Sequence, residues 1–199
     1  MKKILFILFV LVLQISSASP VAREKVVEVT SQLVESGKIE EAIAYLDKSA
    51  NMDSSNKAFY HARMGYYYID LGQMDKAEKY LKQAIAEDGK LGFAYNELGY
   101  LYSEQQKTDL SLQNYLKAVQ YDPDDGEGYY GAGLAYYNKQ VYDKAIEYLE
   151  KAIPRYKKEQ KYSYMEDAYT IIVQIYEKQG NEAKLNETIE RAEKDLGNN

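Results

Sequence analysis

The chain has 199 residues, a formal net charge of −6 and no Cys. Without Cys it can form no disulfide, zinc–cysteine site, thiol nucleophile or bacterial lipoprotein anchor, and its acidity disfavours nucleic acid as a partner. Its 22 Tyr, beside four Phe and no Trp, are the unusual feature. Half-polar aromatic residues at this density serve helix packing or an interaction surface.

The first predicted element is a signal peptide over residues 1–18. Two Lys precede an apolar run over residues 4–13, which is too short to cross a bilayer comfortably, since about 20 residues are needed. Ser16 and Ala18 are small residues at the spacing that a signal peptidase requires. We therefore expect cleavage after Ala18, export to the periplasm or the medium of a bacterium, and no stable membrane span afterwards. The alternative is an uncleaved membrane anchor.

Residues 19–199 are predicted to form a single domain of about five repeats. A motif of aromatic and small residues that begins at His61 returns every 34 residues, at Tyr95 and at Tyr129. Such a period is typical of a solenoid of small helical units, whose usual role is to present a binding surface. The repeats are placed near residues 23–57, 58–91, 92–125, 126–165 and 166–199.

The first helix of each repeat is predicted to pack through repeat positions 4, 7 and 11, which share one helical face. This packing stripe consists of Val26, Val29, Leu33, His61, Met64, Tyr68, Tyr95, Leu98, Tyr102, Tyr129, Ala132, Tyr136, Tyr169, Ile172 and Tyr176. Position 8 is Gly in the three middle repeats, at Gly65, Gly99 and Gly133. A Gly inside a helix costs about 1 kcal/mol relative to Ala, so three in register indicate close approach of a partner helix.

A turn and a second helix complete each repeat. The turns are predicted at Gly37, Gly72, Gln106, Gln140 and Gly180. The second helices carry small residues at Ala42, Ala77, Ser111 and Ala145, and a larger one four later, at Leu46, Leu81, Tyr115 and Leu149. Pro154 is expected to kink or end the fourth of these helices. The last helix is predicted over residues 182–196, with an apolar face and a solvated outer face.

This pattern resembles the tetratricopeptide repeat family. The family signature is an aromatic residue, Leu-Gly three and four residues later, Tyr three further on, then Ala and a bulky residue four apart. Residues 92–123 match it with Tyr95, Leu98, Gly99 and Tyr102, although Ser111 stands for the usual Ala. The resemblance covers roughly residues 23–196 and implies an all-α, right-handed superhelical solenoid of antiparallel helix–turn–helix repeats.

The resemblance also implies a concave groove lined by repeat positions 2, 5, 9 and 12 of the first helices, here called the groove stripe. Its predicted partner-binding residues are Phe59, Tyr66, Ile69, Phe93, Asn96, Tyr100, Tyr130, Leu134 and Tyr137. An exposed aromatic patch marks an interaction surface, although such residues also pack neighbouring helices together. Asn96 either bonds a peptide backbone as donor and acceptor or belongs to ordinary polar surface. Because the stripe has no basic residue, a client held by its terminal carboxylate is disfavoured.

Other candidate sites have simpler interpretations. His61, the one His, lies on the packing stripe and substitutes for an aromatic residue, rather than acting in catalysis or metal binding. The sequence Asp-Pro-Asp-Asp-Gly over residues 122–126 lacks the rest of a calcium loop and is predicted to be a turn. Arg155, Lys157, Lys158 and Lys161 form either a solvated helix face or a contact for an acidic partner or anionic lipid.

The sequence therefore predicts an exported protein–protein interaction scaffold that holds a peptide segment or a helix of a client in a Tyr-rich groove. No catalytic residue, cofactor or metal is predicted, and nucleic acid is not an expected partner. The alternative is a glycan-binding protein, because aromatic grooves also stack on sugar rings. Such a site normally adds carboxylates and amides, for which only Asn96 and Glu127 are obvious candidates.

Overall fold

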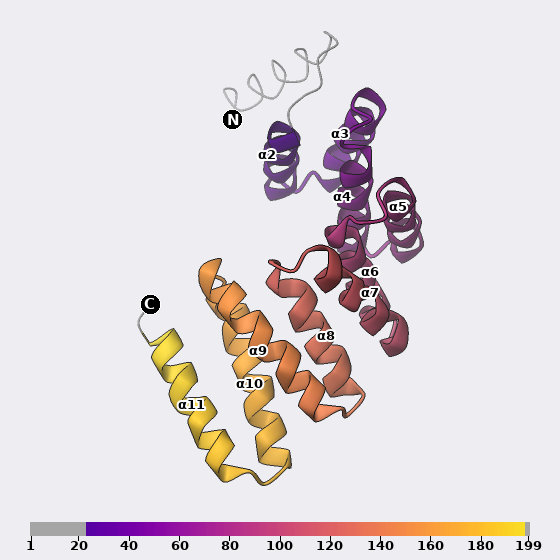
Figure 1. Ribbon diagram of the computed structural model, residues 1–199. Helices are drawn as coiled ribbons and strands as arrows, with labels where there is room; N and C mark the ends of the chain where they lie inside the picture. The colour runs from indigo at the N-terminus through magenta and orange to yellow at the C-terminus, as the bar shows by residue number, and fades with distance from the viewer. Residues whose placement is uncertain (1–22, 198–199) are drawn as a thin grey trace. The chain divides into compact units, whose positions relative to one another are not determined.

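The computed structural model describes residues 23–197, and this part of the chain is helical throughout, with short turns between the helices (Figure 1). Its helices are α2 (Arg23–Glu35), α3 (Ile39–Met52), α4 (Lys57–Asp70), α5 (Met74–Glu87), α6 (Gly92–Glu104), α7 (Thr108–Tyr121), α8 (Gly126–Asn138), α9 (Tyr142–Lys158), α10 (Tyr162–Lys178) and α11 (Glu182–Leu196). The predicted signal peptide lies outside the described residues. The last helix has the predicted bounds.

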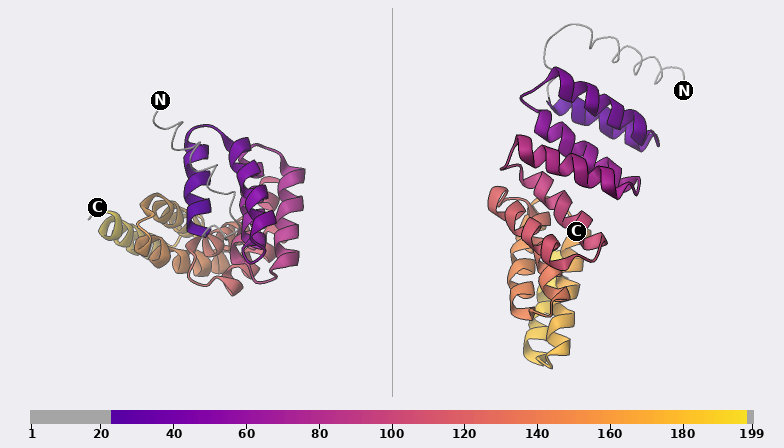
Figure 2. Two further views of the ribbon diagram at one scale, coloured as in Figure 1. Left: turned by 90° about the horizontal axis from the view of Figure 1, so that it is seen from above. Right: turned by 90° about the vertical axis from the view of Figure 1, so that its right-hand side faces the viewer.

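The chain divides into two compact units, which meet in sequence between Asp88 and Gly89. Unit 1 contains α2 to α5, and unit 2 contains α6 to α11. In each unit, helices pair in chain order as hairpins, and the second helix of one hairpin also contacts the first helix of the next, as α3 does with α4, α7 with α8 and α9 with α10. Figure 2 shows these stacked hairpins from two further directions.

The predicted packing stripe is the buried side of the first helices. Val26, Met64 and Ile172 are at most 1% exposed, and the stripe residues Tyr68, Tyr136 and Tyr176 are half-buried. The small and large residues predicted to pack on the second helices, such as Ala77 and Leu81, are buried as well. Burial of this apolar surface drives the hairpins to stack.

The glycines at repeat position 8 lie where two helices nearly touch, as predicted. A Cβ on Gly65 would stand 2.6 Å from Leu81 Cγ, and one on Gly133 would stand 2.7 Å from Leu149 Cγ. No methyl group fits at these separations, because carbon atoms rest about 3.5–4.0 Å apart. Close approach of the second helix therefore explains the repeated Gly.

Tyr115 occupies the position that Leu holds in the neighbouring repeats, and its ring needs two glycines. A Cβ on Gly99 of α6 would stand 2.8 Å from the ring, and one on Gly131 of α8 would stand 2.3 Å from it. Ser111, one turn before Tyr115 on α7, donates a hydrogen bond of 2.9 Å from its Oγ to the Gly99 carbonyl. The Ser and Tyr that depart from the repeat pattern thus both fit the surface around Gly99.

The predicted turns have left-handed backbone. Gly72 has φ of 68°, and Gln106 and Gln140 adopt nearly the same conformation, with φ of 58° and 59°. This region costs a residue with a side chain roughly 1–2 kcal/mol. The backbone is therefore strained at Gln106 and Gln140, and a Gly at either position would remove that strain.

Pro154 does not end α9, so that part of the prediction is wrong. The helix continues through it to Lys158, and the extra residues lengthen α9 and α10 to 17 residues each. Pro removes one backbone donor, but its neighbours Ile153 and Tyr156 are 4% and 0% exposed. Their burial favours continuing the helix past the proline.

Candidate functional site

The groove-stripe residues of unit 1 are used largely for packing. Phe59 and Tyr66 are half-buried against the unit's core, and Ile69 is 8% exposed. The Arg23 guanidinium carbon lies 3.6 Å from the centroid of the Phe59 ring, which is a cation–π contact. These side chains are thus already engaged within unit 1.

The groove stripe of unit 2 presents more aromatic surface. Tyr100 is 44% exposed, and Phe93, Tyr130 and Leu134 are half-buried. The Tyr130 ring meets the ring of Tyr156 edge to face, with centroids 6.0 Å apart. Tyr100 is therefore the stripe aromatic with the largest exposed fraction.

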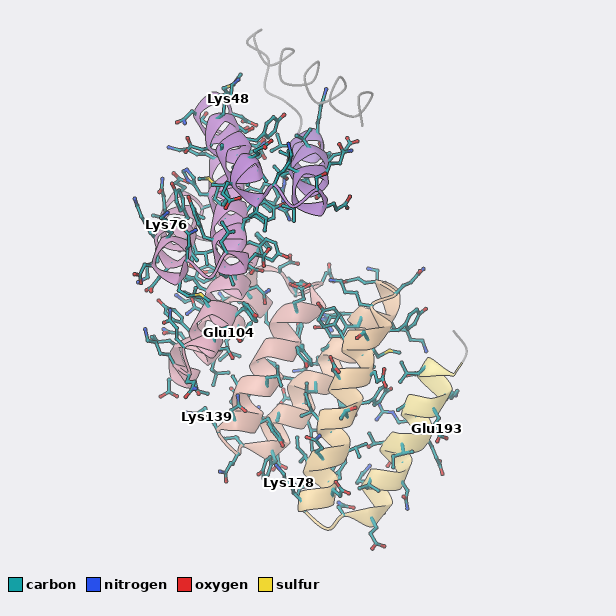
Figure 3. All side chains as sticks on the ribbon, turned by 180° about the vertical axis from the view of Figure 1, so that it is seen from behind. Lys48, Lys76, Glu104, Lys139, Lys178 and Glu193 are labelled. Carbon is teal, nitrogen blue, oxygen red and sulfur yellow. The ribbon has the colours of Figure 1, made fainter. Side chains whose placement is uncertain are left out.

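Tyr137, the last of the predicted stripe residues, joins α8 to α10. Lys178 donates a hydrogen bond of 2.7 Å from Nζ to the Tyr137 hydroxyl, and the same ammonium lies 4.6 Å from the ring centroid. Figure 3 shows Lys178 at the end of unit 2 where α8 and α10 finish, near Lys139. A lysine of the chain itself thus contacts one face of the Tyr137 ring.

Asn96 is buried, with 6% exposure, and is not the surface amide that one interpretation expected. Its Nδ2 donates to Glu127 Oε2 at 3.2 Å and to Glu97 Oε1 at 3.4 Å. Its Oδ1 is also buried and has no hydrogen-bond partner. An unsatisfied buried acceptor costs about 1–3 kcal/mol, so the Nδ2 bonds to the two carboxylates are what hold Asn96 in this position.

Lys161 completes this polar cluster from the turn between α9 and α10. Its Nζ lies 2.9 Å from Glu127 Oε1 and 2.9 Å from Glu159 Oε2. Burial opposes the charge, but the hydrogen bonds to the two carboxylates prevail and raise the pKa of Lys161. We call Asn96, Glu97, Glu127 and Lys161 the Asn96 cluster.

Sequence reasoning missed two members of the Asn96 cluster. Glu97 is only 6% exposed, yet its repeat position holds Arg63 and Gly131 elsewhere, so no pattern marks it as buried. Lys161 was assigned to a basic helix face. Two other cations of that face also have internal contacts, since Arg155 lies 4.1 Å from the Tyr129 ring centroid and Lys157 pairs with Asp195 at 2.7 Å.

His61 packs as predicted, with 4% exposure, and also has a partner that the sequence did not reveal. Its Nδ1 lies 2.7 Å from Glu87 Oε2, and its ring centroid lies 5.8 Å from that of Tyr80. Burial raises the pKa of Glu87, but the hydrogen bond and charge of His61 outweigh it and the net shift is downward. These contacts account for a polar residue at this position.

The acidic segment over residues 122–126 is the turn between α7 and α8, as predicted. Asp125 is the N-cap of α8 and accepts a hydrogen bond of 3.1 Å from the Glu127 amide. Burial raises the pKa of Asp125 to about 6. Within residues 23–197, no three His, Asp or Glu side chains gather as metal ligands.

A cleft of about 590 Å³ lies between α10 and α11. Val173, Ile189 and Leu196 are among the residues that line it. It therefore adds an apolar surface at the last hairpin of unit 2.

No helix in the described part of the chain has the length and apolar character needed to span a membrane.

Comparison with known proteins relates this architecture to repeat proteins. A family model described as TPR repeat matches residues 99–140, and one described as tetratricopeptide repeat matches residues 60–90 and 126–157. No curated protein matches the sequence.

Two solved structures of MamA superimpose on the chain. A crystal structure of MamA has a TM-score of 0.66 at 24% identity, covering 85% of this chain and 93% of that one. MamA from Desulfovibrio magneticus RS-1, from residue 41 to the end, has a TM-score of 0.67 at 19% identity, covering 90% and 98%. At these identities the likeness concerns the fold alone. The family matches, together with the stacked hairpins and the glycines at their contacts, show that the chain belongs to the tetratricopeptide repeat family.

Proposed function

We propose that this protein is an exported, non-catalytic scaffold that binds a segment of a client protein along the groove stripe of unit 2. Tetratricopeptide repeats support the general role of a protein–protein interaction scaffold. The observation that carries the specific site is Tyr100, a large aromatic side chain that is 44% exposed on α6. A rigid aromatic ring with a hydroxyl group contributes strongly to interfaces, whose energy concentrates in a few such residues.

Asn96 supports the same surface because it precedes Tyr100 by one helical turn on the same face. Its Nδ2 holds the Glu127 carboxylate at 3.2 Å, and that carboxylate, on a side chain that is 38% exposed, can accept a hydrogen bond from a backbone N–H of an extended segment. Tyr130, on α8, adds a half-buried ring to this surface. A client segment would thus find aromatic contact area and a hydrogen-bond acceptor together.

The predicted partner-binding residues of unit 1, Phe59, Tyr66 and Ile69, have a smaller part in this proposal. Because Phe59 and Tyr66 pack against the core of unit 1, shortening either side chain would destabilise the unit as well as any interface. Tyr100 gives the cleaner test, since the packing stripe lies on another face of its helix.

The test is calorimetric titration with peptides selected from a random library by binding to residues 19–199. We expect Tyr100→Ala to weaken binding by about thirtyfold, which corresponds to about 2 kcal/mol. Leu110→Ala on α7 is the matched control, since Leu110 is 42% exposed but lies on a second helix. Equal affinity for the wild-type protein and Tyr100→Ala would refute the site.

Export rests on the first 18 residues, which combine a basic start, an apolar run and small residues before position 19. We expect the mature protein to begin at Ser19. Mass spectrometry of the protein purified from the cell envelope or the medium tests this, and a mature chain that retains Lys2 would contradict it.

A glycan is the second candidate ligand. The observation in its favour is that Asn96 and Glu127, the amide and carboxylate that a sugar site needs, lie 3.2 Å apart beside the groove aromatics. A glycan array probed with the wild-type protein and with Tyr100→Ala distinguishes the two candidates. Sugar binding that Tyr100→Ala abolishes, without peptide binding, would replace the proposal.

A further inference from the structure

The Asn96 cluster offers a ligand one accessible hydrogen-bond acceptor, the Glu127 carboxylate, whose side chain is 38% exposed. Asn96 and Glu97 are each 6% exposed, and the Asn96 Nδ2 is already directed at the Glu97 and Glu127 carboxylates. The Asn96 Oδ1 has no hydrogen-bond partner but is itself buried, so Asn96 contributes by holding Glu127 in place through its Nδ2. Since an ionised carboxylate only accepts, a ligand that suits this cluster must donate to Glu127.

Two tyrosines stand beside this cluster on neighbouring first helices. Tyr100 follows Asn96 by one turn of α6, and Tyr130 follows Glu127 by one turn of α8, so each ring shares a helix face with a residue of the cluster. Asp167 of α10 adds another negative charge near Tyr130: burial raises the pKa of the Tyr130 hydroxyl, and the Asp167 charge raises it further. Aromatic faces surrounded by carboxylates attract cations.

Lys161 shows that a cation fits the cluster. Its ammonium lies 2.9 Å from Glu127 Oε1, but it also lies 2.9 Å from Glu159 Oε2. Lys161 is partly exposed and sits in the turn before α10. A stronger donor can therefore take its place at Glu127 while Lys161 keeps its bond to Glu159.

We propose that the client segment bound by unit 2 carries a cationic side chain, Arg in preference to Lys, that lies against Tyr100 and Tyr130 and donates to the Glu127 carboxylate. This inference rests on the proposed function and specifies its partner. Arg is preferred because its planar guanidinium has five donors and stacks on aromatic rings, whereas an ammonium is a strongly hydrated point charge.

Charge and local precedent agree with a cationic partner. The chain has a net charge of −6, and its groove stripe has no basic residue but contains Glu24, Glu127, Asp167 and Glu177. Complementary charge speeds association and excludes partners of the wrong sign. A Tyr ring of unit 2 already makes a cation–π contact, since the Arg155 guanidinium carbon lies 4.1 Å from the centroid of the Tyr129 ring.

The experiment uses the peptides selected from the random library against residues 19–199. We expect them to be enriched in Arg, and replacement of that Arg by Lys and by Gln to weaken binding in that order. Glu127→Gln should weaken binding by about tenfold, and Asn96→Ala should weaken it too. Asp143→Asn, the same loss of charge at an exposed position of α9, is the matched control and should leave affinity nearly unchanged.

Lys161→Met should change peptide affinity in the direction opposite to Glu127→Gln. If the ammonium of Lys161 competes for Glu127, its removal should strengthen binding of the Arg peptide by several fold, with the thermal midpoint measured to confirm that the variant is folded. Unchanged or weaker binding by folded Lys161→Met would overturn the exchange at Glu127.

The outcomes separate this inference from the proposed function. Selected peptides without Arg or Lys enrichment, whose binding still depends on Tyr100, would overturn the cationic partner and leave the groove as the binding site. Binding that is insensitive to both Tyr100→Ala and Glu127→Gln would overturn both. Loss of affinity in Asp143→Asn equal to that in Glu127→Gln would show that only overall charge matters.

Discussion

The ring of Tyr115 lies between Gly99 of α6 and Gly131 of α8. Gly131→Ala tests how tightly the ring is packed there. A Cβ at residue 131 would stand 2.3 Å from ring atoms Cε1 and Cζ of Tyr115 and 2.5 Å from Cδ1. The ring has little room to move toward α6, because the Gly99 backbone is so close on that side that an added Cβ would stand 2.8 Å from the ring. Overpacking of this kind costs about 1–3 kcal/mol or more.

The helix propensity of Ala works in the opposite direction. Replacing a helical Gly by Ala stabilises the folded state by about 1 kcal/mol. Because a separation of 2.3 Å puts the overpacking cost in the upper part of its range, about 2–3 kcal/mol, we expect a net loss of about 1–2 kcal/mol for Gly131→Ala. For a chain of this length, 1 kcal/mol shifts the thermal midpoint by about 2–4 °C. The expected fall is therefore roughly 2–8 °C, measured by circular dichroism or calorimetry.

A double-mutant cycle identifies the cause. Tyr115→Leu introduces the residue that the other repeats carry there, and on the Gly131→Ala background it should be less damaging than on the wild type by about 1 kcal/mol or more. Gly128→Ala on the same helix is the control, because its Cβ would lie 3.2 Å from Ala118 Cβ. A raised midpoint in Gly131→Ala, or no coupling to Tyr115→Leu, would refute the packing described for this ring.

Three further expectations concern single positions. His61→Tyr should keep the fold, since the same repeat position holds Tyr95 and Tyr129, whereas His61→Ala should lower the free energy of unfolding measured in urea; loss of client binding by folded His61→Tyr would instead indicate a functional histidine. Gln140→Gly, with φ of 59° at residue 140, should stabilise by up to about 1 kcal/mol, and Gly72→Ala, with φ of 68°, should destabilise; equal midpoints in both variants would contradict the strain. Because burial raises the pKa of Asp125 in the folded state to about 6, above its usual value of about 3.9, its protonated form favours folding, and that stability is lost as the pH rises through about 6. Asp125→Asn should therefore gain stability over the wild type between about pH 4 and about pH 7, and a difference that is constant over this range would count against the shift.

Much of the fold could be predicted because the repeat places equivalent contacts at equivalent positions. Gly65, Gly99 and Gly133 recur in register, and a contact between helix backbones is the simplest reason for a helical Gly. The apolar spacing of the stripes similarly indicates which face is buried. Such local periodicity survives in the folded structure because each repeat packs mainly on its neighbours.

The structural features that the sequence did not predict lie at positions that do not follow the repeat pattern. Gly131 looks like one more Gly in a helix until the Tyr115 ring is placed beside it. Glu97 is buried by contacts between helices that a single sequence does not record, and the pairing of Glu127 with Lys161 joins residues 34 positions apart in the chain. Pro154 was misjudged because the burial of the residues around it outweighs the loss of one backbone hydrogen bond.

The repeat pattern indicated which positions form the candidate site, but not how exposed each side chain is. The stripe included Asn96, Tyr100 and Glu127, but periodicity alone gives all stripe residues equal weight. The structure distinguishes them, since Ile69 is 8% exposed whereas Tyr100 is 44% exposed. Side-chain size and the helix that lies opposite decide that difference, and neither follows from the repeat period.

Site-specific photo-crosslinking in the cell that makes the protein tests the central claim most directly. A benzophenone amino acid is placed at Tyr100 in one variant and at Leu110 in another, two positions of nearly equal exposure, 44% and 42%, on the first and second helix of one hairpin. We expect a discrete crosslinked client from position 100 and none from position 110. Crosslinks to the same client from position 110 alone would contradict a binding surface on the first helices.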